Sequence, residues 1–140
     1  QPLESEMHIS GLPTFHAQVR ANSCNGGQLF VTMSDGTSGL RLGHATMDLR
    51  YRDGGYEAKS VTPFSTYTMK MEFNPMDVVI PEGHTIQLEI SDSGEDYLPS
   101  TCASAGVTLV EAEQPLSLPL IDRSANDERW FEVPPWWETE

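Results

Sequence analysis

The sequence is short of cysteine, lysine and long apolar runs, and each shortage excludes a class of protein. Its two cysteines, Cys24 and Cys102, lie far apart, which excludes a CxxC metal or redox motif. No apolar run approaches the roughly 20 residues that a membrane-spanning helix needs. The first ten residues, QPLESEMHIS, have neither the basic region nor the apolar stretch of a signal peptide, although a mature or excised fragment would look the same.

Positive charge is also scarce. The 140 residues contain 21 acids against 8 bases, a formal net charge of -13, and only two of the bases are lysines. This balance repels phosphate backbones and anionic lipid, so we expect no nucleic-acid or membrane partner. An acidic, lysine-poor surface slightly favours an extracellular or periplasmic location, but a surface tuned for solubility explains it equally well. The location therefore stays unknown.

Both cysteines stand in turn-like surroundings, NSCNGG for Cys24 and PSTCASAG for Cys102. Compartment decides whether such cysteines pair. A disulfide between two loops at one end of the fold and two unrelated free thiols are both open. If the bond forms, closing so long a loop adds roughly 3–5 kcal/mol in the chain-entropy model.

What the sequence does contain is alternation with a period of two. With 38% apolar and 21% charged residues, it fits one soluble globular domain. Four segments place apolar side chains on one face and polar ones on the other, as half-buried antiparallel strands do. The run VTLV is a further short strand. Gly-, Asn- and Asp-rich breakers separate them. The pattern predicts an all-β fold, a jelly-roll β-sandwich of seven or eight short strands, five of which are placed at residues 15–20, 28–33, 67–73, 85–90 and 107–110.

Two regions depart from this pattern. The segment 38–68 is predicted to cross the outside of the sandwich, with Arg41, Arg50 and Arg52 pairing with the acidic surface. The end of the chain is an acidic, extended tail stiffened by two adjacent prolines, and it contains all three tryptophans, Trp130, Trp136 and Trp137. We expect this tail, residues 124–140, to fold back over the sandwich domain of residues 1–123. Docking on a partner or on another part of a parent chain is the alternative.

Four phrases in order resemble one family. They are PLESEMHISGLP, QLFVTMSDGTSGLRLGHA, MKMEFNPMDVVIPEGHTIQLEISDSGEDYLPS and PLSLPLI. Together they are similar to the C-terminal jelly-roll domain of X-Pro dipeptidyl-peptidase and cocaine-esterase type (CocE/NonD) serine hydrolases. The match covers roughly residues 1–123, and Leu40, Arg41 and His44 stand at motif positions. SDSGEDYLP departs from the family's SSsdfP, the connection after Asp35 is short, and the tail lies outside the pattern.

The resemblance implies a galactose-binding-like jelly roll without catalytic residues. In that family the Ser-His-Asp triad lies in a preceding α/β-hydrolase domain, with its serine in a G-x-S-x-G turn. This sequence contains no G-x-S-x-G; the nearest fragment, GTSG, has the wrong spacing. The resemblance therefore implies an inert accessory domain that packs on the hydrolase domain of a parent dipeptidyl-peptidase or esterase and shapes substrate access. A free-standing module that binds carbohydrate or a protein partner is the alternative.

Three residues are assigned structural roles. His84 follows Gly83 in a turn and has no local group to act on as a general base, so we expect its imidazole to tie the turn to the backbone of a neighbouring strand. His44 is predicted to be a buried, hydrogen-bonded histidine, with a face toward the parent as the alternative. His8 and His16 lie on strands, too scattered for a metal cluster.

The remaining candidates are binding residues. The acids Asp92, Glu95 and Asp96 offer several oxygens in one loop, as calcium requires, but a solvated loop explains them too, so no cofactor is expected. Exposed aromatics are what a carbohydrate platform needs. The candidates are Tyr51, Tyr56 and Tyr97 in loop-like positions and the three tryptophans of the tail.

Overall fold

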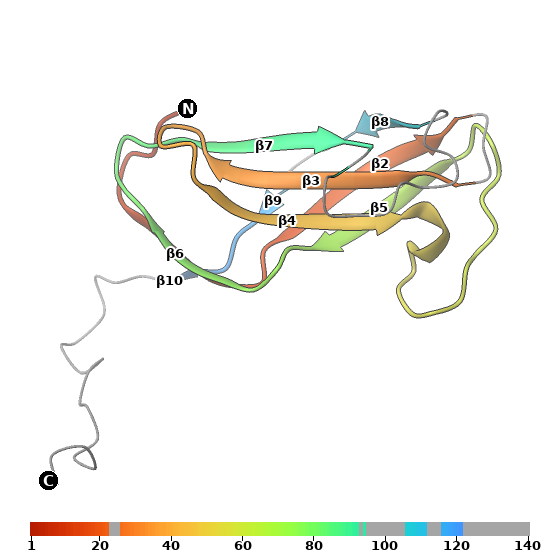
Figure 1. The fold of residues 1–140 in the computed structure, drawn as a ribbon, viewed down its shortest axis with the longest axis horizontal. Helices are drawn as coiled ribbons and strands as arrows, with labels where there is room; N and C mark the ends of the chain where they lie inside the picture. Colours follow the sequence, from red (N-terminus) through yellow and green to blue (C-terminus); the bar gives the residue numbers. More distant parts are fainter. Residues whose placement is uncertain (23–25, 93, 95–105, 112–115, 122–140) are drawn as a thin grey trace, which may run out of the picture.

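The fold is an antiparallel β-sandwich (Figure 1). The computed structural model describes residues 1–22, 26–92, 94, 106–111 and 116–121. Within these ranges no helix is long and apolar enough to cross a membrane. The elements are β1 (Met7–Gly11), β2 (Thr14–Ala21), β3 (Gln28–Asp35), β4 (Arg41–Asp48), the 3-10 helix η1 (Leu49–Tyr51), β5 (Thr66–Glu72), β6 (Met76–Ile80), β7 (Ile86–Ser91), β8 (Val107–Glu111), β9 (Leu116–Ser117) and β10 (Leu120–Ile121).

Two sheets form the layers of the sandwich, and a third extends one of them. One layer has the order β5-β2-β8, with β9 also pairing with β2, and the other has the order β4-β3-β7. Figure 1 shows β3, β4 and β7 crossing over β2 and β5. The third sheet, β10-β1-β6, continues the first layer toward the N-terminal end.

The core lies between the two layers and is built by the alternation that the sequence predicts. Phe15 and Val19 of β2 and Val31 and Met33 of β3 are fully buried. Across the first layer Phe15 faces Met71 in the strand register, so large side chains meet in pairs. Burying each such side chain contributes roughly 1.5–3 kcal/mol. The five predicted strands are confirmed as β2, β3, β5, β7 and β8.

The prediction for residues 38–68 is partly wrong, because this segment begins with β4 and η1. The strand β4 pairs with β3 along its whole length, and a bulge interrupts the register between Met33 and Ser34. The bulge shifts the alternation of β4 by one residue. Leu42 and Met47 therefore pack on the core together with buried Ala45, although Leu42 has the opposite parity. Because of this shift, the sequence of β4 does not alternate with a period of two along its whole length, and the pattern does not predict the strand.

Prolines interrupt the first layer where it meets the third sheet, at the junctions of β1 with β2, of β5 with β6 and of β9 with β10. Only Leu12 and Pro13 separate β1 from β2, Pro75 precedes β6, and Pro119 precedes β10. A proline cannot donate to the ladder of hydrogen bonds. Two bonds to proline carbonyls bridge the break, from Phe73 N to Pro13 O at 2.9 Å and from Ser10 N to Pro119 O at 3.0 Å. We call this row of breaks the proline corner.

Candidate functional site

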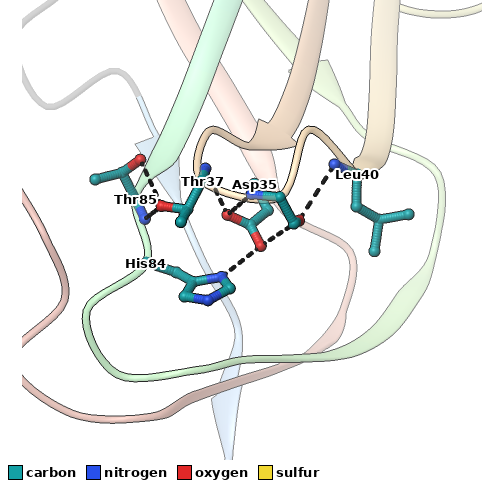
Figure 2. A network of polar contacts seen from close by, with 6 residues as sticks. Asp35, Thr37, Leu40, His84 and Thr85 are labelled. Carbon is teal, nitrogen blue, oxygen red and sulfur yellow. Dashed lines mark hydrogen bonds and ion pairs between the residues drawn. The ribbon is translucent and has the colours of Figure 1, made fainter.

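A network of polar contacts surrounds Asp35, at the end of β3 (Figure 2). Asp35 is only 4% exposed. Its Oδ2 accepts hydrogen bonds from Ser38 Oγ at 2.6 Å and from His84 Nδ1 at 2.7 Å, and its Oδ1 accepts one from Thr37 N at 2.9 Å. We call Asp35, Thr37, Ser38, His84 and Thr85 the Asp35 junction.

The local sequence explains how Asp35 comes to accept these bonds. An Asp side chain bonds readily to the backbone two residues further on, which is the Asx-turn that Thr37 N completes here. The backbone of Asp35 closes the β3–β4 turn, through Asp35 N to Leu40 O and Gly39 N to Asp35 O, both 2.8 Å. Gly39 has a φ of 75°, a left-handed conformation that glycine adopts without cost. The carboxylate is therefore held by its own turn.

The contacts of Asp35 keep its carboxylate charged. The hydroxyl of Ser38 holds the pKa of Asp35 well below its usual range, although burial opposes this by raising it. The His84 contact and the backbone N–H groups of Thr37 and Ser38 lower the same pKa further, because each donor favours the ionised form. The junction thus holds a buried negative charge satisfied by surrounding donors.

The junction joins three segments that are distant in the sequence. The β6–β7 turn is bonded to the β3–β4 turn by Gly36 N to Thr85 O at 2.7 Å and Thr85 N to Thr37 Oγ1 at 3.2 Å. The N-terminal segment joins through Leu3, whose N–H donates to His84 O at 2.8 Å. Figure 1 shows these turns and the N-terminus at one end of the sandwich.

An acid, a histidine and a hydroxyl therefore meet, but their bonds do not form a nucleophilic triad. In a triad the serine hydroxyl donates to the second ring nitrogen of the histidine, which takes its proton. Here the hydroxyl of Ser38 donates to Asp35, to the same oxygen that His84 contacts. A hydroxyl that donates to a carboxylate is not activated by the imidazole. The arrangement can fix turns, and it offers no proton relay from serine to histidine.

The structure places His84 and Gly83 in the turn that the sequence predicts. The turn spans Pro81 to His84 and is closed by His84 N to Pro81 O at 3.2 Å. Gly83 has a φ of 79°, as the third position of a type II turn requires. The partner of the imidazole differs from the prediction, because it is the carboxylate of Asp35 and not a strand backbone.

His44 lies on β4 and is half-buried, not buried. Its ring stacks on Phe30, with centroids 5.7 Å apart and planes 8° apart. Phe30 is not part of the main core cluster yet is only 4% exposed. A side chain at Gly94 would approach the Phe30 ring within 2.5 Å, so glycine is needed at that position.

The other predicted residues are not brought together. Tyr51 is 36% exposed, and its ring centroid lies 5.9 Å from the Arg50 guanidinium, while Tyr56 is fully exposed. His8 and His16 lie on β1 and β2, as expected, and His8 pairs with Asp77 of β6. Asp92 is exposed. The remaining candidates lie outside the described residues, namely Cys24, Tyr97, Glu95, Asp96, Cys102, Trp130, Trp136 and Trp137.

The predicted pairing of arginines with acids is seen for Arg50. Arg50 Nη2 lies 2.7 Å from Asp48 Oδ2. Arg52 instead donates to Leu49 O at 2.9 Å and lies over the Tyr67 ring at 4.4 Å. Within the described ranges no group of three or more His, Cys, Asp or Glu side chains is placed to hold a metal ion. The calcium prediction is untested, because Glu95 and Asp96 lie outside these ranges.

The fold and the junction define a β-sandwich domain whose polar cluster fixes turns. The sequence matches the family described as the X-Pro dipeptidyl-peptidase C-terminal non-catalytic domain over residues 1–117, and the chain belongs to that family. This confirms the resemblance that the four phrases indicate. No curated protein matches the sequence.

Solved structures share the fold. An α-amino acid ester hydrolase matches with a TM-score of 0.67 at 17% identity, over 86% of this chain and 24% of its own. An aminopeptidase from the marine sediment archaeon Thaumarchaeota archaeon matches with 0.67 at 14%, over 87% and 25%. A CocE/NonD family hydrolase from Staphylococcus aureus matches with 0.65 at 8%, over 86% and 30%. This chain therefore spans between 24% and 30% of the length of these proteins.

Sequence reasoning missed Asp35 and Ser38, although a signal was present. The segment SDGTSG has an acid followed by two hydroxyl residues in a turn, the composition of an Asx-turn. Reading it only as a strand breaker left the carboxylate without a partner. The partner, His84, lies 49 positions further on, and only the pairing of β3 with β7 brings the two together.

Proposed function

We propose that this chain is the non-catalytic accessory domain of a serine hydrolase, either a dipeptidyl-peptidase or an esterase, whose triad lies outside these residues. The domain packs on the α/β-hydrolase domain and helps to wall the cleft through which substrate enters. The family match over residues 1–117 is the observation that carries this proposal.

The chemistry of the Asp35 junction supports an accessory role. Ser38, the hydroxyl nearest to the histidine–acid pair, donates to Asp35 at 2.6 Å and is not bonded to the imidazole. A serine hydrolase needs the opposite arrangement, in which a base removes the proton of the hydroxyl as it attacks the substrate carbonyl. In the parent protein that reaction is acyl transfer to water through a serine acyl-enzyme, and it belongs to the other domain.

The lengths of the solved structures also support this role. The sandwich covers 24% of the α-amino acid ester hydrolase and 25% of the archaeal aminopeptidase. Both names describe hydrolases of acyl bonds, and in both most of the chain lies outside the shared sandwich. We infer the same division of labour for the protein to which these 140 residues belong.

A turnover assay of two proteins tests the proposal. One is the 140-residue chain, and the other is the complete reading frame that encodes it. With chromogenic X-Pro and ester substrates, we expect the complete protein to turn over substrate and the 140-residue chain to be inert. Deleting the sandwich from the complete protein should raise KM, because the cleft loses one wall.

Two variants and one binding measurement give the controls. Hydrolysis by the purified 140-residue chain that disappears in both Ser38→Ala and His84→Ala would show a working site at the Asp35 junction and refute the proposal. A reading frame without a hydrolase domain, together with saturable sugar binding on a glycan array, would instead favour a free-standing binding module. None of the three relatives named above is described as binding carbohydrate.

A further inference from the structure

The connection between η1 and β5 exposes an aromatic side chain on an unfavourable backbone. Phe64 has a φ of 63° and is the one non-glycine residue with a positive φ among the described residues. It is also 69% exposed. A bulky residue in the left-handed region is a rare outlier, and such outliers concentrate at functional sites.

The turn that holds Phe64 is of type II. It spans Thr62 to Ser65 and is closed by Ser65 N to Thr62 O at 3.2 Å. Pro63 occupies the second position, which proline favours, and Phe64 occupies the third, where glycine or asparagine is expected. Glycine would adopt the conformation of the third position at lower conformational cost, and most of the phenylalanine side chain lies in solvent.

Neighbouring contacts keep the turn in this conformation. Val61 is buried in the core. The backbone of Thr62 donates to the Tyr67 hydroxyl at 2.7 Å, and the backbone of Phe64 donates to Ala21 O at 2.8 Å. The residues on both sides of Phe64 are thus fixed while its ring stays outside. A rigid exposed aromatic loses little freedom when it binds, which makes it a good anchor.

The surrounding charge distinguishes this connection from the rest of the chain. The whole sequence carries a net charge of -13. Residues 48–65 instead carry no formal net charge, because three bases, Arg50, Arg52 and Lys59, balance three acids, Asp48, Asp53 and Glu57. Charge repulsion between two copies of so acidic a chain opposes self-association. The partner is therefore a different surface, which receives this less acidic region.

We infer that Phe64 is an anchor residue through which this domain docks into an apolar pocket on the α/β-hydrolase domain. The inference rests on the proposed function and adds to it the residue and the end of the sandwich that make contact. The hydrolase domain is the occupant because solved proteins with this fold devote most of their length to other parts. The backbone conflict is retained because the ring contributes to docking.

The first test measures the 140-residue chain alone by thermal unfolding. Phe64→Gly should raise Tm by about 2–4 °C, because glycine relieves the left-handed conformation and the mostly exposed ring contributes little packing. Phe64→Ala retains the backbone conflict and should leave Tm within about 1–2 °C. Tyr56→Ala removes a fully exposed aromatic from the same connection; it is the control and should leave Tm unchanged. A fall in Tm for Phe64→Gly would show that the ring packs on its own chain and would refute the inference.

The second test measures the complete reading frame. Hydroxyl-radical footprinting should modify Phe64 at least about fivefold more slowly in the complete protein than in the 140-residue chain, and Tyr56 serves as the reference. Phe64→Ala should increase proteolytic release of the sandwich by about tenfold, the effect of losing one interface anchor, whereas Phe64→Leu should retain most of the docking.

The outcomes separate this inference from the proposed function. If the sandwich is protected elsewhere but Phe64 reacts equally in both proteins, the anchor is wrong and the accessory role stands. If no face of the sandwich is protected in the complete protein, both are wrong.

Discussion

Two type II turns lie at opposite ends of the sandwich and are closed by hydrogen bonds of the same length. One has a residue type that suits its backbone conformation, and the other does not. His84 N to Pro81 O and Ser65 N to Thr62 O are both 3.2 Å. At the third position one turn has Gly83, with a φ of 79°, and the other has Phe64, with a φ of 63°. The first turn belongs to the Asp35 junction, where donors and acceptors are matched. The second displays an aromatic ring to solvent.

The difference teaches how to separate architecture from function in a domain without catalytic residues. At the Asp35 junction each residue type suits its conformation and its contacts, so stability alone explains the arrangement. At Phe64 the residue type opposes its conformation, and stability of the isolated chain explains neither the ring nor its exposure. An exposed residue whose type opposes its backbone conformation is therefore a better indicator of a contact surface than a cluster of polar groups.

Both turns are attached to the same core, and substitutions in this core should change the free energy of unfolding most. Phe15 is fully buried between the layers. Phe15→Ala should reduce the free energy of unfolding by about 3–5 kcal/mol, because a cavity remains where the ring was removed. Urea denaturation measures this change. A loss below about 1 kcal/mol would mean that the two layers do not pack as described.

Exchanging the residues at the third position of the two turns should change the free energy of unfolding in opposite directions. Nothing lies within 4 Å of a Cβ built at Gly83, so Gly83→Phe meets no steric obstacle and should cost about 1–2 kcal/mol from conformation alone. Gly83→Asn, which tolerates the left-handed region, should cost less. Phe64→Gly should stabilise the same chain. Urea midpoints that move in the same direction for Gly83→Phe and Phe64→Gly would remove the contrast between the turns.

The Asp35 junction should lose stability in acid. The pKa of Asp35 is depressed in the folded state from its ordinary value of 3.8, so the contribution is complete above about pH 4 and is lost as pH falls through the more acidic range. Asp35→Asn should flatten this acid dependence of the unfolding free energy. Asp53→Asn, an exposed acid in the other connection, is the control and should leave the slope as it is. Equal slopes for wild type and Asp35→Asn would argue against the junction.

The smallest effect is expected at Tyr56. Its side chain is fully exposed, so Tyr56→Ala should change the free energy of unfolding of the 140-residue chain by less than about 0.5 kcal/mol. The same urea experiment measures it. A larger change would show that exposed aromatics in this connection pack on the domain, and it would weaken the comparison drawn from Phe64.

The sequence predicts the core well because alternation and burial share one physical cause. A strand with one face on the core must alternate, and Val19 and Val31 are buried as the pattern requires. Where a bulge shifts the phase, as at Leu42 in β4, the alternation breaks and the strand is missed. The strand β6 was missed for another reason, since prolines flank its five residues.

The site was less predictable, because its partners meet only through tertiary structure. His84 was assigned to its turn from the neighbouring glycine, but its partner, Asp35, depends on how β3 and β7 pair. Phe64 was invisible for a different reason. The letters TPFS fit both a type I turn and a type II turn, and only the second gives the phenylalanine a positive φ.

The proline corner has a consequence for a chain pulled from its N-terminus. Tension applied through Gln1 would first break the two bonds between Leu3 and the β6–β7 turn. It would then peel away β1, because β1 pairs with β6 and β10 and the ladder is broken before β2. The rupture would then halt at Pro13, which is fully buried, and the main sandwich beyond it would stay closed. If a neighbouring domain pulled on this end of the chain, β1 would thus separate before the main sandwich opened.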